Sequence, residues 1–216
     1  MTDLVPGRRA AAGALIAAGR RLAEGGLVTG TAGNLSVRVG DHVLATGSGT
    51  TLGDLTAERL SLVDLDGTVL DGPRPTSELP LHLAVYRSTE VTAIAHAHAM
   101  ASVAVGATND VLPPIHYLTV LLGGVVRVAE YATFGSTALA SHVRSALDGR
   151  HAALLRNHGS VATGTDIGQA CDRLELVEWL AEVYRQAATL GTPTLLTEAE
   201  LADAAATFTR LDYPGY

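Results

Sequence analysis

The sequence predicts a mixed α/β fold in which a largely antiparallel central sheet is covered by helices on both faces. Short runs of strand-forming residues alternate along the chain with longer segments of helical hydrophobic periodicity. The turn pairs Gly40-Asp41 and Asp66-Gly67 join neighbouring runs as hairpins, which favours antiparallel pairing. The 216 residues contain no proline- or serine-rich linker, so we expect a single domain over residues 1–216.

The first half of the chain is expected to contain one helix and two hairpins. An alanine-rich helix over 8–25 ends at Gly25-Gly26, because consecutive glycines do not continue a helix. Two pairs of strands follow, and each pair flanks one of the turns named above. The expected strands are 34–39 with 42–46, and 60–64 with 68–70.

The second half alternates helices and strands. A helix is expected over 76–87, with Pro80 tolerated in its first turn. A strand of small apolar residues follows over 93–98. Thr197 and Glu200 form a capping box that begins the last helix. The other expected elements are helices over 99–107, 136–147 and 166–190, and strands over 125–128 and 152–155.

The composition excludes several classes of function. The formal charge of -7 argues against affinity for nucleic acid or anionic membranes, because both require clustered cations. All 15 basic residues are arginine, which excludes Schiff-base aldolases, pyridoxal-phosphate enzymes and P-loop kinases, since each needs a lysine amine. No apolar run reaches the roughly twenty residues of a membrane span. We therefore expect a small-molecule ligand.

Two features indicate a cytoplasmic location. The single cysteine, Cys171, cannot form an internal disulfide, which suggests a reducing compartment. Arg8-Arg9 before an alanine-rich run imitates an export signal, but the run closes on Arg20-Arg21 instead of a cleavage site. We interpret this segment as the first helix of a cytoplasmic protein.

The strand over 93–98 carries the strongest chemical signal. His96 and His98 are two residues apart, so a strand places both imidazoles on one face. His158 follows another apolar run and completes a set of three, which leaves an open fourth position as in a catalytic zinc site. Two hydrogen-bonded core histidines are the alternative. We expect surface or capping roles for His42, His82, His142 and His151, and for His116 a place near the ligands at most.

Glu78 is the carboxylate that we expect to act as acid or base. It follows two hydroxyl residues, Thr76 and Ser77, at a helix start whose amides and dipole suit an anion. An ordinary glutamate of a first helical turn is the alternative. Asn34 and the loop Thr46-Gly47-Ser48-Gly49 are able to surround a phosphate with amides and hydroxyls, although such residues also serve as simple turn residues.

Taken together, these residues resemble the class II aldolase and adducin family, of which fuculose-phosphate aldolases are typical. The matching motifs occur in the family's order over nearly the whole chain. They are Gly33-Asn34-Leu35-Ser36, Thr46 to Gly49, Thr76-Ser77-Glu78 with His82 following, His96-Ala97-His98, Tyr131 to Gly135, and Asn157-His158-Gly159.

The resemblance implies a zinc ion held by His96, His98 and His158, with Glu78 as a fourth ligand that leaves when substrate binds. It implies a phosphate site formed by Asn34, Ser48, Gly49, Thr76 and Ser77. It also implies a homotetramer with active sites at subunit interfaces, in which Tyr117 acts as a catalytic acid on the neighbouring subunit's substrate. A tyrosine of the tail, Tyr213 or Tyr216, would close the site.

The chain departs from the family pattern at two positions. Gly47 replaces the usual proline of the phosphate loop, and we expect this to loosen the loop without removing its donors. Thr76 replaces a serine, which keeps the hydroxyl and adds a methyl group to the site.

The implied activity is reversible cleavage of a ketose 1-phosphate, of the L-fuculose 1-phosphate type, to dihydroxyacetone phosphate and a short aldehyde such as lactaldehyde. A sugar-phosphate dehydratase is an alternative, because zinc and Glu78 suit β-elimination equally well. A 4-epimerase would need an acid and base pair, and residues 118–122 contain no aspartate. A zinc-hydroxide hydrolase leaves Glu78 and the phosphate loop unexplained, and a non-catalytic adducin-like module leaves the three histidines unexplained.

Overall fold

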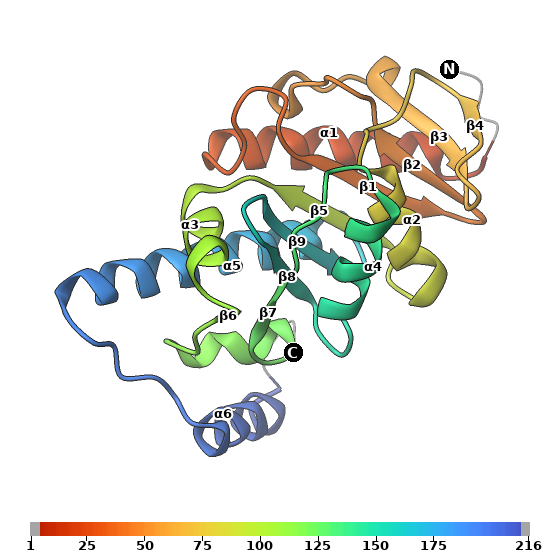
Figure 1. Cartoon of the computed structure of the whole chain (residues 1–216). Helices are drawn as coiled ribbons and strands as arrows, with labels where there is room; N and C mark the ends of the chain where they lie inside the picture. Colours follow the sequence, from red (N-terminus) through yellow and green to blue (C-terminus); the bar gives the residue numbers. More distant parts are fainter. Residues whose placement is uncertain (1–4, 213–216) are drawn as a thin grey trace.

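A nine-stranded mixed sheet forms the centre of the computed structural model, which describes residues 5–212 (Figure 1). The strand order is β4-β3-β2-β1-β5-β9-β8-β7-β6, and the pair β7–β8 alone is parallel within this sheet. The predicted largely antiparallel sheet is therefore confirmed. The strands are β1 Asn34–Val39, β2 His42–Thr46, β3 Leu60–Asp64, β4 Val69–Asp71, β5 Ala93–Ala97, β6 Val111–Leu112, β7 Val126–Ala129, β8 Ala152–Leu155 and β9 Gly159–Gly164.

Helices cover both faces of the sheet, as predicted. The helices α1, α3 and α5 pack on one face and share an apolar core with it, whereas α2 and α4 pack on the other face. The helix α6 lies apart from the sheet and packs on a 3₁₀ segment, η3 (Figure 1). The helices are α1 Arg8–Glu24, α2 Leu79–Ser88, α3 Met100–Thr108, α4 Thr137–Ala146, α5 Ile167–Leu190 and α6 Glu198–Arg210, and η3 spans Tyr117–Leu122.

The alternation of side chains along β5 divides it between the two cores. Ala93, Ala95 and Ala97 belong to the core under α1, α3 and α5, and Ile94 belongs to the core under α2 and α4. His96 shares the face of Ile94, because side chains two residues apart point the same way. The central strand therefore directs one imidazole toward the start of α2.

Several boundaries differ from those expected. Strand β5 ends at Ala97, so His98 lies directly after the strand instead of within it. Strand β4 is shifted by one residue. Strands β6 and β9 and the 3₁₀ segment η3 were not predicted. The sequence of β9 is Gly-Ser-Val-Ala-Thr-Gly, which is typical of a loop, yet all six residues are buried between β5 and β8. Burial on both faces of the sheet, and not an alternating pattern, makes this segment a strand.

The predicted helix over 76–87 is present as α2, but it begins three residues later than expected. Glu78 is its N-cap, Leu79 is its first residue, and Pro80 lies in the first turn. The capping box of Thr197 and Glu200 is present at α6. Within the described residues, no helix is both long and apolar enough to cross a membrane.

Candidate active site

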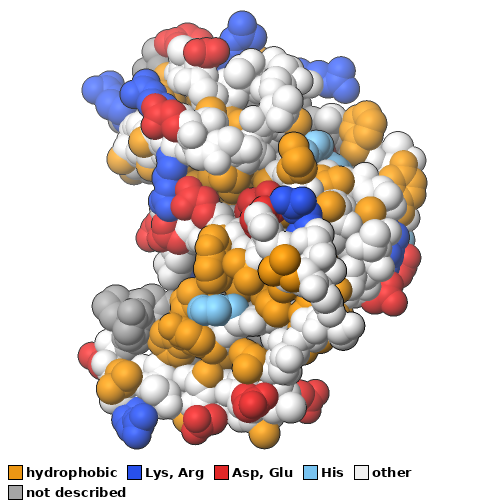
Figure 2. Space-filling view, turned by 90° about the vertical axis from the view of Figure 1, so that its left-hand side faces the viewer, with side chains coloured by type: hydrophobic (Ala, Val, Ile, Leu, Met, Phe, Trp, Pro, Cys, Tyr) orange, Lys and Arg blue, Asp and Glu red, His pale blue; other side chains and the backbone are white. Residues whose placement is uncertain are grey.

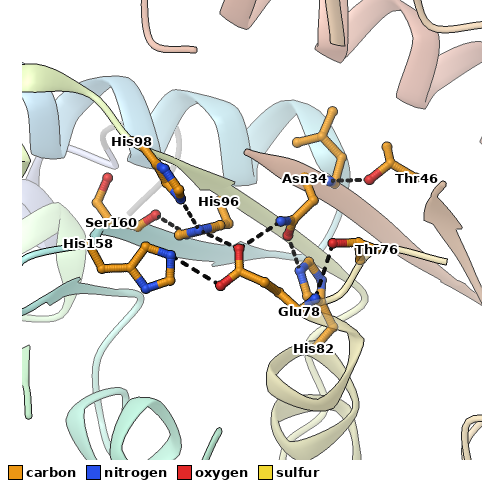
Figure 3. A network of polar contacts seen from close by, with 10 residues as sticks. Asn34, Thr46, Thr76, Glu78, His82, His96, His98, His158 and Ser160 are labelled. Carbon is orange, nitrogen blue, oxygen red and sulfur yellow. Dashed lines mark hydrogen bonds and ion pairs between the residues drawn. The ribbon is translucent and has the colours of Figure 1, made fainter. Parts of the chain in front are cut away.

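Four side chains from three segments converge beside the centre of the sheet. His96 lies in β5 and His98 directly follows that strand, His158 lies between β8 and β9, and Glu78 is the N-cap of α2. One ligand atom from each residue lies within 4.8 Å of every other. Figure 3 shows the three imidazoles and the carboxylate together. The three predicted metal ligands and the predicted acid or base are thus brought to one point.

The distances fit a small metal ion. Glu78 Oε2 lies 2.9 Å from His96 Nε2, and Glu78 Oε1 lies 3.1 Å from His158 Nε2. His96 Nε2 also lies 3.0 Å from His98 Nε2. A tetrahedral ion with bonds of about 2.1 Å needs donors separated by about 3.4 Å. Small movements of these side chains are therefore enough to coordinate one ion.

The hydrogen bonding of His96 supports the same interpretation. Its Nδ1 lies 2.8 Å from the carbonyl oxygen of Ser160 and donates to it. Because the neutral ring carries one proton, Nε2 then presents a lone pair toward His98 and Glu78. Metal-bound histidines usually make this contact with the ring nitrogen that does not bind the metal. Lone pairs and a carboxylate therefore face one another, and a shared cation satisfies them.

The protonation of the cluster is consistent with cation binding. Burial alone would raise the pKa of Glu78, but the adjacent His96 and His158 imidazoles hold that pKa well below its ordinary value. Burial lowers the pKa of His96, and the Glu78 carboxylate outweighs it and raises that pKa. The pKa of His98 is lowered to about 4 by burial and by its two histidine neighbours. Glu78 is thus ionised and His98 neutral near pH 7. The raised pKa of His96 favours a proton on Nε2 beside Glu78, and a metal ion that binds there would displace this proton.

A row of buried polar side chains continues from Glu78 into the protein. Asn34 Nδ2 donates to Glu78 Oε2 (2.9 Å), and Asn34 Oδ1 lies 2.6 Å from His82 Nε2. His82 Nδ1 lies 2.7 Å from Ser36 Oγ, which lies 2.8 Å from the hydroxyl of Tyr86. The expected surface or capping role of His82 is therefore wrong, because its side chain is fully buried. Burial lowers the pKa of His82 to about 3, with His96 contributing.

The spacing of these residues in the sequence indicates that they share one face of each element. Glu78, His82 and Tyr86 recur every four residues, so they share one stripe of α2. Asn34 and Ser36 are two residues apart and share one face of β1. A polar stripe on a helix and a polar strand face of matching length are able to pair when both are buried.

The backbone around His158 is closely packed. Asn157 has a φ of 54°, which few residues other than glycine and asparagine adopt, and it lines the cavity described next. Gly159 follows His158 and begins β9. A Cβ atom at position 159 would lie 3.0 Å from Cδ2 of His98 and would overlap the carbonyl oxygen of Ala97. Glycine at this position lets β9 pair with β5 while His98 keeps its place.

A cavity of about 500 Å³ opens beside Glu78 and the histidine cluster. All five residues predicted to bind phosphate line it, together with Glu78, His98 and His158. Among the described residues no arginine lines this cavity, so an anion there meets neutral donors. Gly47 of the predicted phosphate loop also lines it. The sequence analysis gave no individual role to the other lining residues, although some lie in the family motifs; they are Thr31, Ala32, Gly33, Thr50, Tyr131, Ala132, Phe134 and Asn157.

The loop at Gly47 is anchored to a neighbouring segment. The amide of Gly47 donates to the carbonyl of Arg59 (2.7 Å), and the amide of Ser48 donates to the carbonyl of Arg74 (2.9 Å). A Cβ at position 47 would lie 2.7 Å from the carbonyl oxygen of Arg59. Proline has no amide hydrogen for the first of these bonds, so glycine provides an anchor that offsets the expected loosening. The amide of Ser48 is occupied, which leaves its hydroxyl as the donor of that residue.

Tyr117 lies outside this cavity. It begins η3, is 49 % exposed, and stacks on His116 with ring centroids 4.4 Å apart. His116 caps η3 by accepting a hydrogen bond from the amide of Leu118, and it contacts Trp179 rather than the ligands. Figure 2 shows hydrophobic side chains gathered on the lower half of one face of the molecule. The role of Tyr117 stays a prediction, and Tyr213 and Tyr216 lie outside the described residues.

The sequence profile of the class II aldolase and adducin N-terminal domain matches residues 13–185. The chain belongs to this family. It is 36% identical over 189 residues to a 5-methylthioribulose-1-phosphate/5-deoxyribulose-1-phosphate aldolase of Rhodospirillum rubrum, over 87% of this chain and 86% of the relative. It is 38% identical over 178 residues to a 3-oxo-tetronate 4-phosphate decarboxylase of Haemophilus influenzae, over 79% and 84% respectively.

A solved structure of an L-fuculose 1-phosphate aldolase superimposes with a TM-score of 0.88 at 35% identity. The match covers 93% of this chain and 96% of that one. The predicted family and fold are therefore confirmed. The chain is a metal-dependent lyase of the class II aldolase family, and its Glu78 and three-histidine cluster is able to bind the metal.

Proposed function

We propose that the chain is a zinc-dependent aldolase that reversibly cleaves a ketose 1-phosphate, of the L-fuculose 1-phosphate type, to dihydroxyacetone phosphate and a short aldehyde such as lactaldehyde. The observation that carries this proposal is the convergence of Glu78 and three histidines beside a cavity lined by neutral hydrogen-bond donors. Carbanion chemistry in a chain without lysine needs a metal in place of an imine.

His96, His98 and His158 would hold the zinc, with Glu78 as the fourth ligand at rest. Three imidazoles with an exchangeable fourth position are typical of catalytic zinc. Zinc bound there would polarise the substrate carbonyl and stabilise the negative charge that develops as the carbon–carbon bond breaks.

The phosphate group of the substrate would lie at the other end of the cavity. The hydroxyls of Ser48, Thr76 and Ser77 and the backbone at Gly49 offer neutral donors there. Gly49 has a φ of 70°, and its missing side chain lets an anion approach the backbone closely. Asn34 lines the same cavity, and its amide group already donates to Glu78.

Glu78 and Tyr117 would exchange the protons of the reaction. In the synthetic direction, the ionised Glu78 removes a proton from the carbon of dihydroxyacetone phosphate that forms the new bond. In the cleavage direction, Glu78 returns a proton to that carbon. Tyr117 exchanges the proton of the hydroxyl on the fourth carbon. Because Tyr117 lies outside the cavity of its own chain, we assign it to the site of a neighbouring subunit in a homotetramer.

A cleavage screen tests the substrate and the reaction together. Zinc-loaded protein is incubated with the 1-phosphates of fuculose, rhamnulose, ribulose and 5-deoxyribulose, and release of dihydroxyacetone phosphate is coupled to a reductase. We expect release from at least one of them, and the fastest release from fuculose 1-phosphate. A ketose phosphate that is dehydrated instead, with no dihydroxyacetone phosphate from any of the four, would overturn the proposal.

Decarboxylation is the second candidate, and the relative from Haemophilus influenzae favours it. Loss of carbon dioxide beside a carbonyl leaves the same kind of carbanion as aldol cleavage, so the same metal and Glu78 would serve both reactions. Carbon dioxide release from a 3-oxo acid phosphate, in the absence of aldol cleavage, would decide in its favour.

A further inference from the structure

The contacts of Glu78 extend through four buried residues. The proposed reaction gives a role to Asn34 but none to the other three. Asn34, His82, Ser36 and Tyr86 form a single row between α2 and β1, and each contact is between 2.6 and 2.9 Å. Figure 3 shows the Asn34 side chain in contact with the Glu78 carboxylate through its nitrogen and with the His82 ring through its oxygen. The side chain of His82 is fully buried, and its two ring nitrogens contact Asn34 and Ser36.

The carboxylate at one end fixes the direction of every bond in the row. An ionised carboxylate only accepts, so Asn34 must present its NH₂ group to Glu78 and its oxygen to His82. His82 must then carry its proton on Nε2, which leaves Nδ1 to accept from the hydroxyl of Ser36. Ser36 in turn accepts from the hydroxyl of Tyr86. The alternative tautomer of His82 would set two lone pairs against each other 2.6 Å apart.

We propose that His82 is a positioning residue for Glu78, because it holds the Asn34 amide in the one orientation that donates to the carboxylate. Without the Nε2 donor, the Asn34 amide is free to rotate and to turn its oxygen toward Glu78. Glu78 would then lose the bond to Oε2, which is also the oxygen that lies beside His96. The inference rests on the proposed aldol reaction, in which Glu78 carries the proton.

The anchoring of the row supports this role. His82 and Tyr86 follow Glu78 at intervals of four residues on α2, and Asn34 and Ser36 occupy one face of β1. β1 pairs with β5 so that Asn34 lies opposite His96. The row therefore ties the start of α2, which carries the carboxylate, to the strand beside the metal ligands. Buried partners of this kind orient ligands, and their loss typically costs about 10–100-fold in metal affinity or activity.

The first test reads the tautomer directly. Nitrogen-15 chemical shifts of the His82 ring, measured in the zinc-loaded protein without substrate and assigned by comparison with the His82→Gln variant, distinguish the two tautomers. We expect the proton on Nε2 and none on Nδ1. A proton on Nδ1, or on both nitrogens near pH 7, would overturn the proposal whatever substrate the enzyme uses.

The second test compares two variants that each keep half of the ring's contacts. In His82→Gln the side-chain amide nitrogen takes the place of Nε2, whereas the shorter side chain of His82→Asn reaches only toward Ser36. We expect His82→Asn to bind zinc about tenfold more weakly in a chelator competition and to lose about tenfold in kcat at saturating zinc, with KM changed less than about twofold. We expect His82→Gln to stay within about threefold of the wild type in each quantity.

Ser36→Ala provides a variant that leaves His82 in place. It removes the donor to Nδ1, so we expect an effect between those of the two His82 variants. His42→Asn serves as the control without effect, because His42 pairs with Val39 at the other end of β1 from Asn34. Equal losses in His82→Gln and His82→Asn would mean that His82 only fills space, which overturns the proposal. Zinc affinity and tautomer are measured without turnover, so failure of the proposed reaction would show in the wild type alone and would leave both readouts intact.

Discussion

Strand β1 has two buried faces of opposite chemistry. Toward α1 and α5 it presents Leu35 and Val37, which belong to the larger apolar core. Toward α2 it presents Asn34 and Ser36, which are equally buried but are hydrogen bonded to side chains of that helix or its N-cap. The apolar face is stabilised by contact area, which tolerates changes that conserve volume, whereas the polar face depends on directed bonds. Damage to the first should lower stability, and damage to the second should lower activity.

Among changes on the polar side of β1, removal of the metal should lower activity the most. Dialysis against a chelator is expected to lower the cleavage rate by about 10⁴-fold, because the developing charge loses the ion that stabilises it. Metal analysis before and after dialysis, followed by addition of one equivalent of zinc, should show rate and metal content rising together. Full activity in metal-free protein would contradict this prediction, because the polar face of β1 would then not support a metal-dependent reaction.

Glu78→Gln separates the proton-transfer group from the metal site. We expect this variant to retain one equivalent of zinc when zinc is in excess, since three imidazoles remain, and to lose about 10²–10³-fold in kcat. The glutamine keeps the shape of the side chain but cannot accept a proton. Metal analysis and steady-state rates on the same sample check both parts. A variant that loses metal in proportion to its rate would show that Glu78 acts only as a ligand.

Leu174→Ala probes the apolar side. Leu174 is fully buried on α5 in the core that also contains Leu35. The cavity left by the truncation should lower the free energy of unfolding by about 2–5 kcal/mol. We expect kcat and KM to change less than about twofold at a temperature where the variant stays folded. Urea denaturation and steady-state kinetics provide the two measurements, and a large fall in kcat without loss of stability would contradict the division between the faces.

His82, which bonds to the polar face of β1, should make the stability of the protein depend on pH. This effect is smaller than those predicted above. His82 has a pKa of about 3 in the folded protein, against an ordinary value of 6.5. Between these values the unfolded chain binds a proton at His82 and the folded protein does not. The contribution of neutral His82 to the free energy of unfolding is therefore full above pH 6.5 and is lost as the pH falls toward 3. At about pH 5 the loss is about 2 kcal/mol.

Urea denaturation of chelator-treated protein at about pH 7 and about pH 5 measures this contribution. His82→Gln does not titrate, so its stability should fall less than that of the wild type by about the same amount. All other titratable residues are the same in both proteins, so the difference between the two falls in stability reports on His82. An equal fall in the two proteins would mean that His82 is protonated in the folded state.

The same contrast explains how much the sequence predicted. The helices and the hairpin strands followed from periodicity and turn residues, because apolar burial leaves a repeating pattern. The candidate metal ligands were found from the spacing of the histidines and from the family motifs, and the five candidate phosphate-binding residues from the same motifs. His82 was placed on the surface although it lies in a family motif and shares the four-residue spacing of Glu78 and Tyr86, because a single histidine does not show in the sequence whether it is buried. β9 was missed because glycine and serine carry no hydrophobic pattern, although all six of its residues are buried.

Gly159 makes no contact that a chemist would count as catalytic, yet it controls how closely two strands approach beside His98. The position requires the space that a side chain would fill. A saturation library screened for turnover should retain only glycine at 159. Intolerance to mutation there would then reflect crowding beside His98 and not participation in the reaction.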